Sequence, residues 1–167
     1  RYNDKFQFVN LTLTATTGNL NKNISKLGES IRFTPTKGGT AVVTARVENF
    51  AQTVDIPVKG DFDMLQDLMN DESLSVINLE RNYSYNELDA ITDGIIINRT
   101  LTINGNGYTI DAKGKTRIFK ILAENVTIKN ITFINANVTG DGGAILWNGG
   151  NGNVFDCSFV NNSAGYL

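Results

Sequence analysis

The sequence predicts an all-β protein that consists of a β-sandwich, a short helix and the first coils of a parallel β-helix. Three observations lead to this prediction. The 167 residues include 22 Asn, 17 Thr and 16 Gly but only two Pro, and Asn, Thr and Gly favour turns and strands over helices. Helical periodicity occurs at a single place in the chain. The part that follows it repeats itself with a period of 23 to 26 residues.

The first domain, residues 1–60, shows the alternation of apolar and polar residues that is typical of strands. Strands are expected at residues 5–9, 11–15, 30–34, 40–47 and 53–58. Turns are expected at residues 17–19 and 37–39, where Gly is combined with polar residues. Strands that follow one another without helices predict a sandwich. Five strands are few for such a domain, so a sandwich that is incomplete at its start stays open as an alternative.

Residues 60–70 contain the helical pattern. Leu65, Leu68 and Met69 form an apolar stripe, and Asp63 followed by Gln66 matches a capping box. An amphipathic helix at the head of a stack of strands is expected to cover the first exposed layer of that stack.

The second domain, residues 61–167, repeats apolar residues at matching positions. The aligned pairs are Leu79 with Ile103, Leu101 with Val126, Ile103 with Ile128, Ile110 with Phe133, Phe119 with Ile145, and Phe133 with Phe159. Each period contains strands of three to five residues and no helical pattern, which excludes helical repeats. Each period is therefore expected to form one coil of a solenoid, with a tight corner at Gly142.

The composition excludes several classes of function. Without histidine, the chain has neither an imidazole metal ligand nor a partner for a catalytic thiol, and Cys157 is expected to be a small buried residue outside any disulfide. The net charge of −2 offers no basic field for nucleic acid, and no apolar run is long enough to insert into a membrane. Since no signal peptide is visible and the chain begins at Arg1, a processed or excised fragment is expected.

Asn-x-Ser/Thr sequons are frequent in the chain. They begin at Asn10, Asn23, Asn82, Asn98, Asn125, Asn130, Asn137 and Asn161. One interpretation is an exported, glycosylated surface protein. The alternative is that Asn and Thr alternate on the outer face of strands and form sequons as a by-product.

Several segments of the repeat resemble a known family. They are Leu-Thr-Ile-Asn-Gly-Asn-Gly at 101–107, Asn-Val-Thr-Ile-Lys-Asn-Ile-Thr-Phe at 125–133, Gly-Gly-Ala-Ile at 142–145 and Cys-Ser-Phe-Val-Asn-Asn-Ser-Ala at 157–164. These segments resemble adhesin-like surface proteins of methanogenic archaea and are similar to the repeats of chlamydial polymorphic outer-membrane proteins. The resemblance implies a right-handed, pectate-lyase-like β-helix joined to an immunoglobulin-like domain, with extracellular display at the cell surface. It implies no particular ligand-binding residue.

The same fold family contains polysaccharide lyases and hydrolases, which use acidic residues on neighbouring coils beside Arg or Lys. The candidates here are Asp111, Asp141 and Asp156, with Lys113, Lys115 and Arg117 nearby. The simpler interpretation is that Asp111 caps a turn, Asp141 lies within a turn, and Asp156 is a solvated strand residue. The sequence does not support calcium binding, because calcium needs several oxygen ligands together.

The expected function is that of a non-catalytic cell-surface adhesin fragment, without a cofactor, which attaches to polysaccharides or to glycans or proteins of another cell. Trp147 and Tyr166 are the candidates for glycan contact, because aromatic rings offer flat apolar faces. Two alternatives stay open. One is a calcium-dependent polysaccharide lyase that ends before its active site, and the other is a filament subunit that associates with itself through exposed coil ends.

Overall fold

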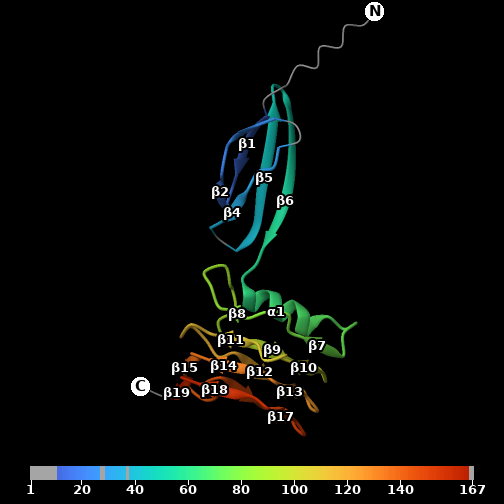
Figure 1. Ribbon diagram of the computed structural model, residues 1–167, viewed down its shortest axis with the longest axis vertical. Coiled ribbons are helices and arrows are strands. Elements are labelled where there is room, and N and C mark those ends of the chain that lie inside the picture. The colour runs from blue at the N-terminus through green and yellow to red at the C-terminus, as the bar shows by residue number, and fades with distance from the viewer. Residues whose placement is uncertain (1–10, 27–28, 37, 166–167) are drawn as a thin grey trace, which may run out of the picture. The chain divides into compact units, whose positions relative to one another are not determined.

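The computed structural model describes residues 11–26, 29–36 and 38–165 (Figure 1). The chain divides into two compact units between Lys59 and Gly60. The regular elements of the described residues are β-strands, apart from one α-helix. The strand expected at residues 5–9 and the first residue of the turn expected at 37–39 lie outside the described residues.

The first unit contains two antiparallel sheets, as an immunoglobulin-like sandwich requires. Its strands are β1 (Leu11–Ala15), β2 (Gly18–Leu20), β3 (Ile24–Ser25), β4 (Phe33–Pro35), β5 (Gly39–Val47) and β6 (Phe50–Val58). One sheet has the order β3-β1-β5-β6, and the other pairs β2 with β4. The turn expected at residues 17–19 lies slightly earlier, at Thr16 and Thr17, because β2 already begins at Gly18. The ring of Phe33 packs where a side chain on that residue would stand, so the glycine serves a close approach between strands.

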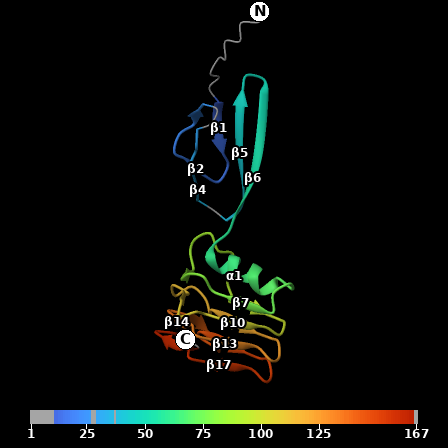
Figure 2. The ribbon, with the colours of Figure 1, turned by 45° about the vertical axis from the view of Figure 1, so that its right-hand side comes forward.

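The second unit is a parallel β-solenoid. Its strands are β7 (Val76–Asn78), β8 (Tyr83–Ser84), β9 (Ile95–Ile97), β10 (Thr102–Asn104), β11 (Thr109–Asp111), β12 (Phe119–Ile121), β13 (Thr127–Lys129), β14 (Thr132–Ile134), β15 (Asn137–Thr139), β16 (Ile145–Trp147), β17 (Asn153–Phe155), β18 (Ser158–Val160) and β19 (Ser163–Gly165). The strands β7–β9 form coil 1, β10–β12 coil 2 and β13–β16 coil 3, and β17–β19 begin coil 4. Figure 2 shows β7, β10, β13 and β17 lying one below another.

The register of the coils confirms most of the aligned pairs. Parallel pairing joins Ile103 to Ile128, Ile110 to Phe133, Phe119 to Ile145 and Phe133 to Phe159. The alignment of Leu79 with Ile103 was wrong, because Ile77 pairs with Ile103. Ile77 and Leu79 are both buried and lie two residues apart, so the alternating pattern alone fits either of them.

Inward-facing side chains fill the solenoid as a single apolar core. Ile103, Phe119, Ile128 and Phe133 are completely buried. The rings of Phe119 and Phe133 meet edge to face at a centroid distance of 5.6 Å. Each coil thus contributes one layer to a stack of side chains, and the solenoid rests mainly on contacts between adjacent coils.

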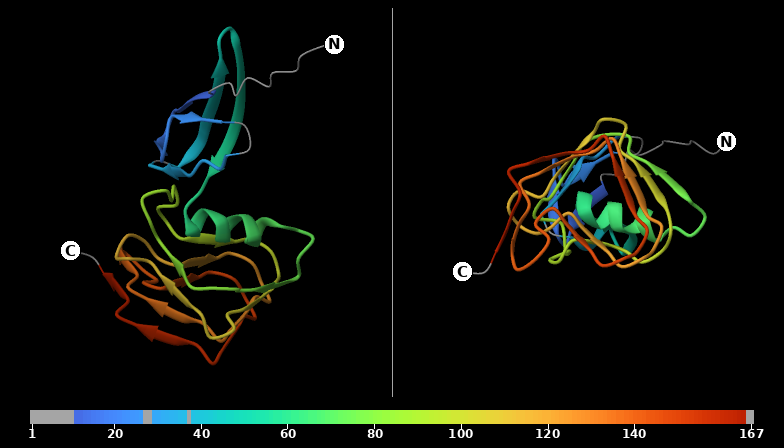
Figure 3. Two further views of the ribbon diagram at one scale, coloured as in Figure 1. Left: turned by 45° about the horizontal axis from the view of Figure 1, so that its top comes forward. Right: turned by 90° about the horizontal axis from the view of Figure 1, so that it is seen from below.

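The helix α1 (Asp61–Asn70) covers coil 1, as expected (Figures 1 and 3). Phe62, Leu65 and Met69 are buried in the core. Gln66 extends this cover to the backbone of β9. Its side-chain oxygen accepts a hydrogen bond from the Ile96 amide at 2.7 Å, and its side-chain nitrogen donates to the Ile96 carbonyl at 2.9 Å.

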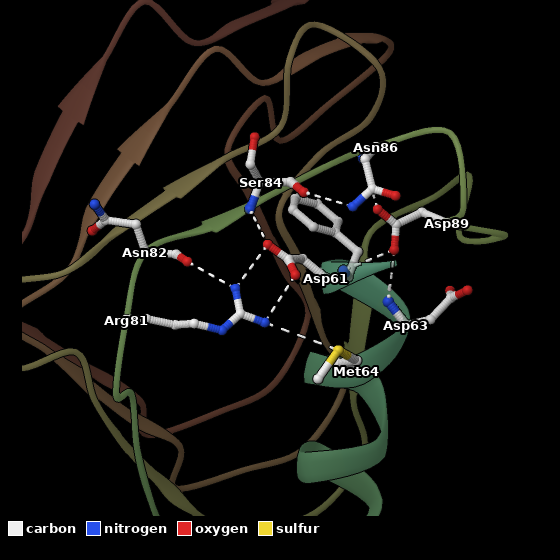
Figure 4. Close-up of polar contacts among 9 residues, drawn as sticks. Asp61, Asp63, Met64, Arg81, Asn82, Ser84, Asn86 and Asp89 are labelled. Atoms are coloured by element: carbon white, nitrogen blue, oxygen red, sulfur yellow. Dashed lines mark hydrogen bonds and ion pairs between the residues drawn. The ribbon is translucent and has the colours of Figure 1, made fainter. Parts of the chain in front are cut away.

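The capping box expected within α1 was wrong, because the cap comes from the loop between β8 and β9 (Figure 4). The Asp89 carboxylate accepts hydrogen bonds from the amides of Phe62 and Asp63 at 2.8 and 3.0 Å. The Asp63 carboxylate in turn accepts from the Ala90 amide at 2.9 Å. Helix and loop therefore satisfy each other's free backbone amides.

A second contact ties the start of α1 to coil 1. The guanidinium group of Arg81 donates two hydrogen bonds to the Asp61 carboxylate, at 2.9 and 3.0 Å (Figure 4). The same guanidinium group lies 4.2 Å from the centre of the Tyr83 ring. Burial would raise the pKa of Asp61, but the bonds from Arg81 and the Ser84 amide hold that pKa below its ordinary value.

Candidate functional site

The described sequon asparagines are all exposed at the surface. They are Asn23, Asn82, Asn98, Asn125, Asn130, Asn137 and Asn161. Asn10 lies outside the described residues. Exposure is compatible with attached glycans, yet Asn125, Asn130 and Asn161 also adopt left-handed backbone conformations at corners of the coils. Since Asn is among the few residues that tolerate this conformation, the fold itself gives a reason for their presence, and glycosylation stays a prediction.

Trp147 has a packing role in the solenoid. It lies on β16 in register with the buried Ile121, and its indole ring packs against Gly152. Contact of Trp147 with a glycan stays a prediction, and Tyr166 lies outside the described residues. Cys157 is a free thiol that is half-buried beside the core, less deeply than expected.

Asp111 caps a turn, in agreement with the simpler interpretation. Its carboxylate accepts hydrogen bonds from the Lys113 amide at 2.8 Å and the Asn135 side chain at 2.9 Å, and it pairs with the Lys113 ammonium group at 2.9 Å. Burial acts to raise the pKa of Asp111, but these partners together hold it below its ordinary value. The carboxylate is thus ionised and engaged in the structure at neutral pH.

Asp141 and Asp156 lie at other corners. Asp141 is an exposed residue of the loop between β15 and β16. Asp156 was wrongly placed in a strand, because it forms the corner between β17 and β18 with a φ of 49°. The equivalent corner of the coil above contains Asn130, with a φ of 61°. Asp111, on β11, has Ser84 and Ile134 as its neighbours in the adjacent coils.

The three aspartates therefore do not form a stack of carboxylates on one face. Within residues 11–26, 29–36 and 38–165, no group of three or more Cys, Asp or Glu side chains is placed to hold a metal ion. The candidate residues that do come together lie at a single corner of the coils. They are Lys113, Lys115, Arg117, Asn137 and Asn161.

Arg117 joins three successive coils. Its buried side chain donates to the Asp93 carboxylate of coil 1 at 2.7 Å and to the carbonyl oxygens of Asp141 and Gly142 in coil 3 at 2.6 and 3.2 Å. Lys120 donates to the other oxygen of Asp93 at 2.6 Å. The bond from Lys120 and then that from Arg117 hold the pKa of Asp93 below its ordinary value, against the effect of burial. Arg117 is therefore a structural tie between coils.

A groove follows the corner at which each coil passes from the sheet of β11 to the sheet of β12. It consists of three adjoining hollows of about 450, 400 and 330 Å³. We call it the corner groove, and it is lined by Tyr85, Asn86, Glu87, Asp89, Thr92 and Asp93 of coil 1, Lys113, Gly114, Lys115 and Arg117 of coil 2, Asn135, Ala136, Asn137, Val138 and Thr139 of coil 3, and Asn161 and Ser163 of coil 4. Lys113, Lys115 and Asn137 each line two of the hollows.

Hydrogen bonds between coils hold the polar side chains of the corner groove in place. The Asn161 side-chain nitrogen donates to the Asn135 side-chain oxygen at 2.7 Å, and Asn135 donates to Asp111. The Ser163 hydroxyl donates to the Asn137 side-chain oxygen at 2.9 Å. Sequence reasoning missed the groove, although Asn135 and Asn161 occupy matching positions of the repeat. The signal for the groove is that matching positions of the repeat lie side by side in adjacent coils.

Comparison with known proteins gives one family. The pectate lyase-like adhesive domain matches residues 58–162, which include α1 and nearly all of the solenoid. Neither the curated proteins nor the solved structures gave a match. No helix among the described residues is long and apolar enough to cross a membrane. Because the match spans more than half of the 167 residues, the chain belongs to the pectate lyase-like adhesive domain family.

Proposed function

We propose that the chain is a non-catalytic attachment module, displayed outside the cell, which holds polysaccharides or surface glycans against the side of its solenoid. The observation that carries this proposal is the match of an adhesive domain to the part of the chain that forms the coils. The corner groove supports it, because it offers a hollow polar surface that extends over several coils. The likeness of the repeats to archaeal and chlamydial surface proteins agrees with such a role and stays an expectation.

The engagement of Asp111 and Arg117 supports attachment over catalysis. Asp111 is bound by Lys113 and Asn135, and Arg117 is held between Asp93 and backbone carbonyl oxygens. A general base must be able to reach a proton of its substrate, and groups fixed in this way serve the stack.

A calcium-dependent lyase is the second candidate, since the matched family is named for its likeness to pectate lyase. Association through coil ends is the third. The inward-facing Val154 and Phe159 on β17 and β18 are 43% and 51% exposed, whereas their partners Ile128 and Phe133 in coil 3 are completely buried. Such a face can pair with another chain.

The test is to incubate the purified chain with a panel of insoluble and soluble polysaccharides, uronate polymers included, with calcium and then with a chelator. Co-sedimentation or co-elution measures attachment, and chromatography of the polymers detects cleavage. Attachment of intact polymers in the chelator is the expected result. Shortened, unsaturated products that need calcium would establish the lyase instead. Heat-unfolded chain is the control for non-specific adsorption.

A further inference from the structure

We infer, on the basis of the proposed function, that the corner groove is the attachment site and that it takes a neutral glycan chain lying along the solenoid axis. Three properties of the groove carry this inference: its direction, the hydrogen-bonding groups that line it, and its balance of charge. Each is set by the way in which the coils stack.

The direction of the groove suits an extended chain. Each coil presents its own polar residue at the same corner, with Asn86, Lys113, Asn135 and Asn161 coming from coils 1 to 4 in turn. Adjacent coils in a parallel stack are about 4.8 Å apart. One coil step is therefore close to the length of one sugar ring, so successive sugars of an extended chain can meet successive coils.

The lining matches hydroxyl groups. Amide and hydroxyl side chains offer both donors and acceptors, as sugar hydroxyls do. Ser163 fixes the orientation of Asn137 by donating to its oxygen, which leaves the amide nitrogen of Asn137 without a partner among the residues that the structure describes. Asn135 is fixed in the same way between Asp111 and Asn161. Groups that are ordered before binding lose less entropy when the ligand arrives.

One aromatic ring lies at the coil 1 end of the groove. The Tyr85 hydroxyl donates to the Ile91 carbonyl at 3.0 Å, and its ring packs edge to face against Phe62 at 5.3 Å. The ring is therefore fixed in position while it lines the hollow beside Lys115. It offers an apolar surface to the C–H face of a sugar.

The balance of charge in the corner groove argues against an acidic glycan as the ligand. Asp111 neutralises Lys113, and Asp93 is shared by Arg117 and Lys120. Lys115 is the one cation of the groove without an acidic partner in the described part of the chain.

Glu87 and Asp89 line the same hollow as Lys115 and oppose its charge. A polymer with a carboxylate on every sugar would meet these acids without a compensating basic field. The groove therefore favours a neutral glycan over a uronate polymer.

The test measures the affinity of the unglycosylated 167-residue chain for hexamers of β-1,4-linked glucose, β-1,4-linked mannose and α-1,4-linked galacturonate, by calorimetry. A neutral hexamer is expected to bind, and its affinity to change by less than about twofold when NaCl is raised from low to high concentration. Lys115→Gln keeps a donor but removes the charge, so it is expected to leave that affinity within about twofold as well.

Asn137→Ala is expected to weaken binding of the neutral hexamer about five- to tenfold, because the free amide donor is lost. Asn137→Asp removes the same donor but keeps an acceptor for Ser163, so weaker binding by both variants separates ligand contact from damage to the stack. Asn98→Ala is the matched control, since it also removes an exposed sequon asparagine but lies at another corner. It is expected to bind as the parent chain does.

Each contrary outcome has a distinct meaning. Tighter binding of the galacturonate hexamer, weakened by salt and by Lys115→Gln, would overturn the assignment of a neutral ligand. Unchanged affinity in Asn137→Ala and Asn137→Asp would place the site outside the corner groove, and the proposed function would stand. Loss of attachment to every polysaccharide of the panel, in the parent chain itself, would overturn the proposed function together with this inference.

Discussion

Asparagine at the corners of the coils is the residue-scale feature that recurs most in this solenoid. Left-handed backbone conformations occur at Asn106, Asn125, Asn130, Asn135, Asn151 and Asn161. For most other residues this conformation costs roughly 1–2 kcal/mol. The geometry of the turns therefore accounts for these six of the 22 Asn, whatever modifications the side chains carry.

Comparison of Asn130 with Asn135 separates the two contributions of these residues. Both have a positive φ, but Asn135 also bonds to Asp111 and Asn161. Asn130→Ala is expected to lower the free energy of unfolding by about 1 kcal/mol, through the backbone alone. Asn135→Ala is expected to lower it by a further 1–2 kcal/mol or so, because two side-chain hydrogen bonds are lost.

Urea unfolding of both variants, followed by circular dichroism, measures this difference. Asn130→Gly serves as the control, since glycine adopts the conformation freely and is expected to cost less than alanine at the same position. Equal losses in Asn130→Ala and Asn135→Ala would show that the ladder of side chains adds no stability.

The elements show how far periodicity alone can predict a structure. The coils, their core residues and the covering helix follow from alternation and from the repeat, since burial on one face imposes both. The error at Leu79 arose because two buried positions two residues apart, Ile77 in β7 and Leu79 just after it, fit the same alternating pattern. The error at β2 arose because Gly18 is required by the ring of Phe33, which is a long-range contact.

The cap of α1 could not be found from local sequence, because Asp89 lies far from the helix along the chain. Asp89→Ala is expected to lower the free energy of unfolding by about 1–2 kcal/mol, since the amides of Phe62, Asp63 and Asn86 lose their acceptor. Asp89→Asn keeps one oxygen acceptor and is expected to cost less.

Chemical denaturation of the purified variants gives the free energies, and amide hydrogen exchange of α1 locates the effect. Glu87→Ala, an exposed change in the same loop, is the control and is expected to stay within about 0.5 kcal/mol of the parent chain. If amide exchange in α1 is also faster in Glu87→Ala, the effect comes from the loop as a whole and is not specific to the Asp89 carboxylate.

At the scale of the whole molecule, the sequence could predict the solenoid but not its groove. The sequence indicates Lys113 and Lys115 as bases near Asp111, and the alignment of Phe133 with Phe159 places Asn135 and Asn161 at matching positions of the repeat. Their assembly into one surface depends on loops of unequal length that stack at a single corner. The repeat predicts which of those residues align between coils, but it does not predict the hollow between them.

Acid is expected to destabilise the solenoid. The pKa values of Asp61, Asp93 and Asp111 are held below their ordinary values in the folded state. Groups of this kind contribute stability above the pKa of the unfolded chain, near 4, and lose it as the pH falls through the lower folded pKa. Burial raises the pKa of Asp89, so its protonation acts in the opposite direction and offsets part of the loss.

Thermal unfolding between about pH 7 and pH 2.5 tests this expectation. The midpoint temperature of unfolding is expected to decrease once the pH is below about 4. Asp93→Asn, which cannot ionise beside Arg117 and Lys120, is expected to unfold at a lower temperature near neutral pH. Its midpoint should then fall less steeply in acid. An identical pH profile in both proteins would exclude Asp93 as a source of the effect.

The constant step between coils 3 and 4 has a consequence for how such a protein changes over generations. Ile128 pairs with Val154 and Phe133 with Phe159, so both strands repeat after 26 residues. A tandem duplication of one such segment in the gene would bring its own core side chains and its own corner asparagine. The duplicated coil would stack against the same kinds of side chain as the original coil does. Gene duplication can therefore lengthen the solenoid by whole coils, and no other residue has to change to accommodate the insertion.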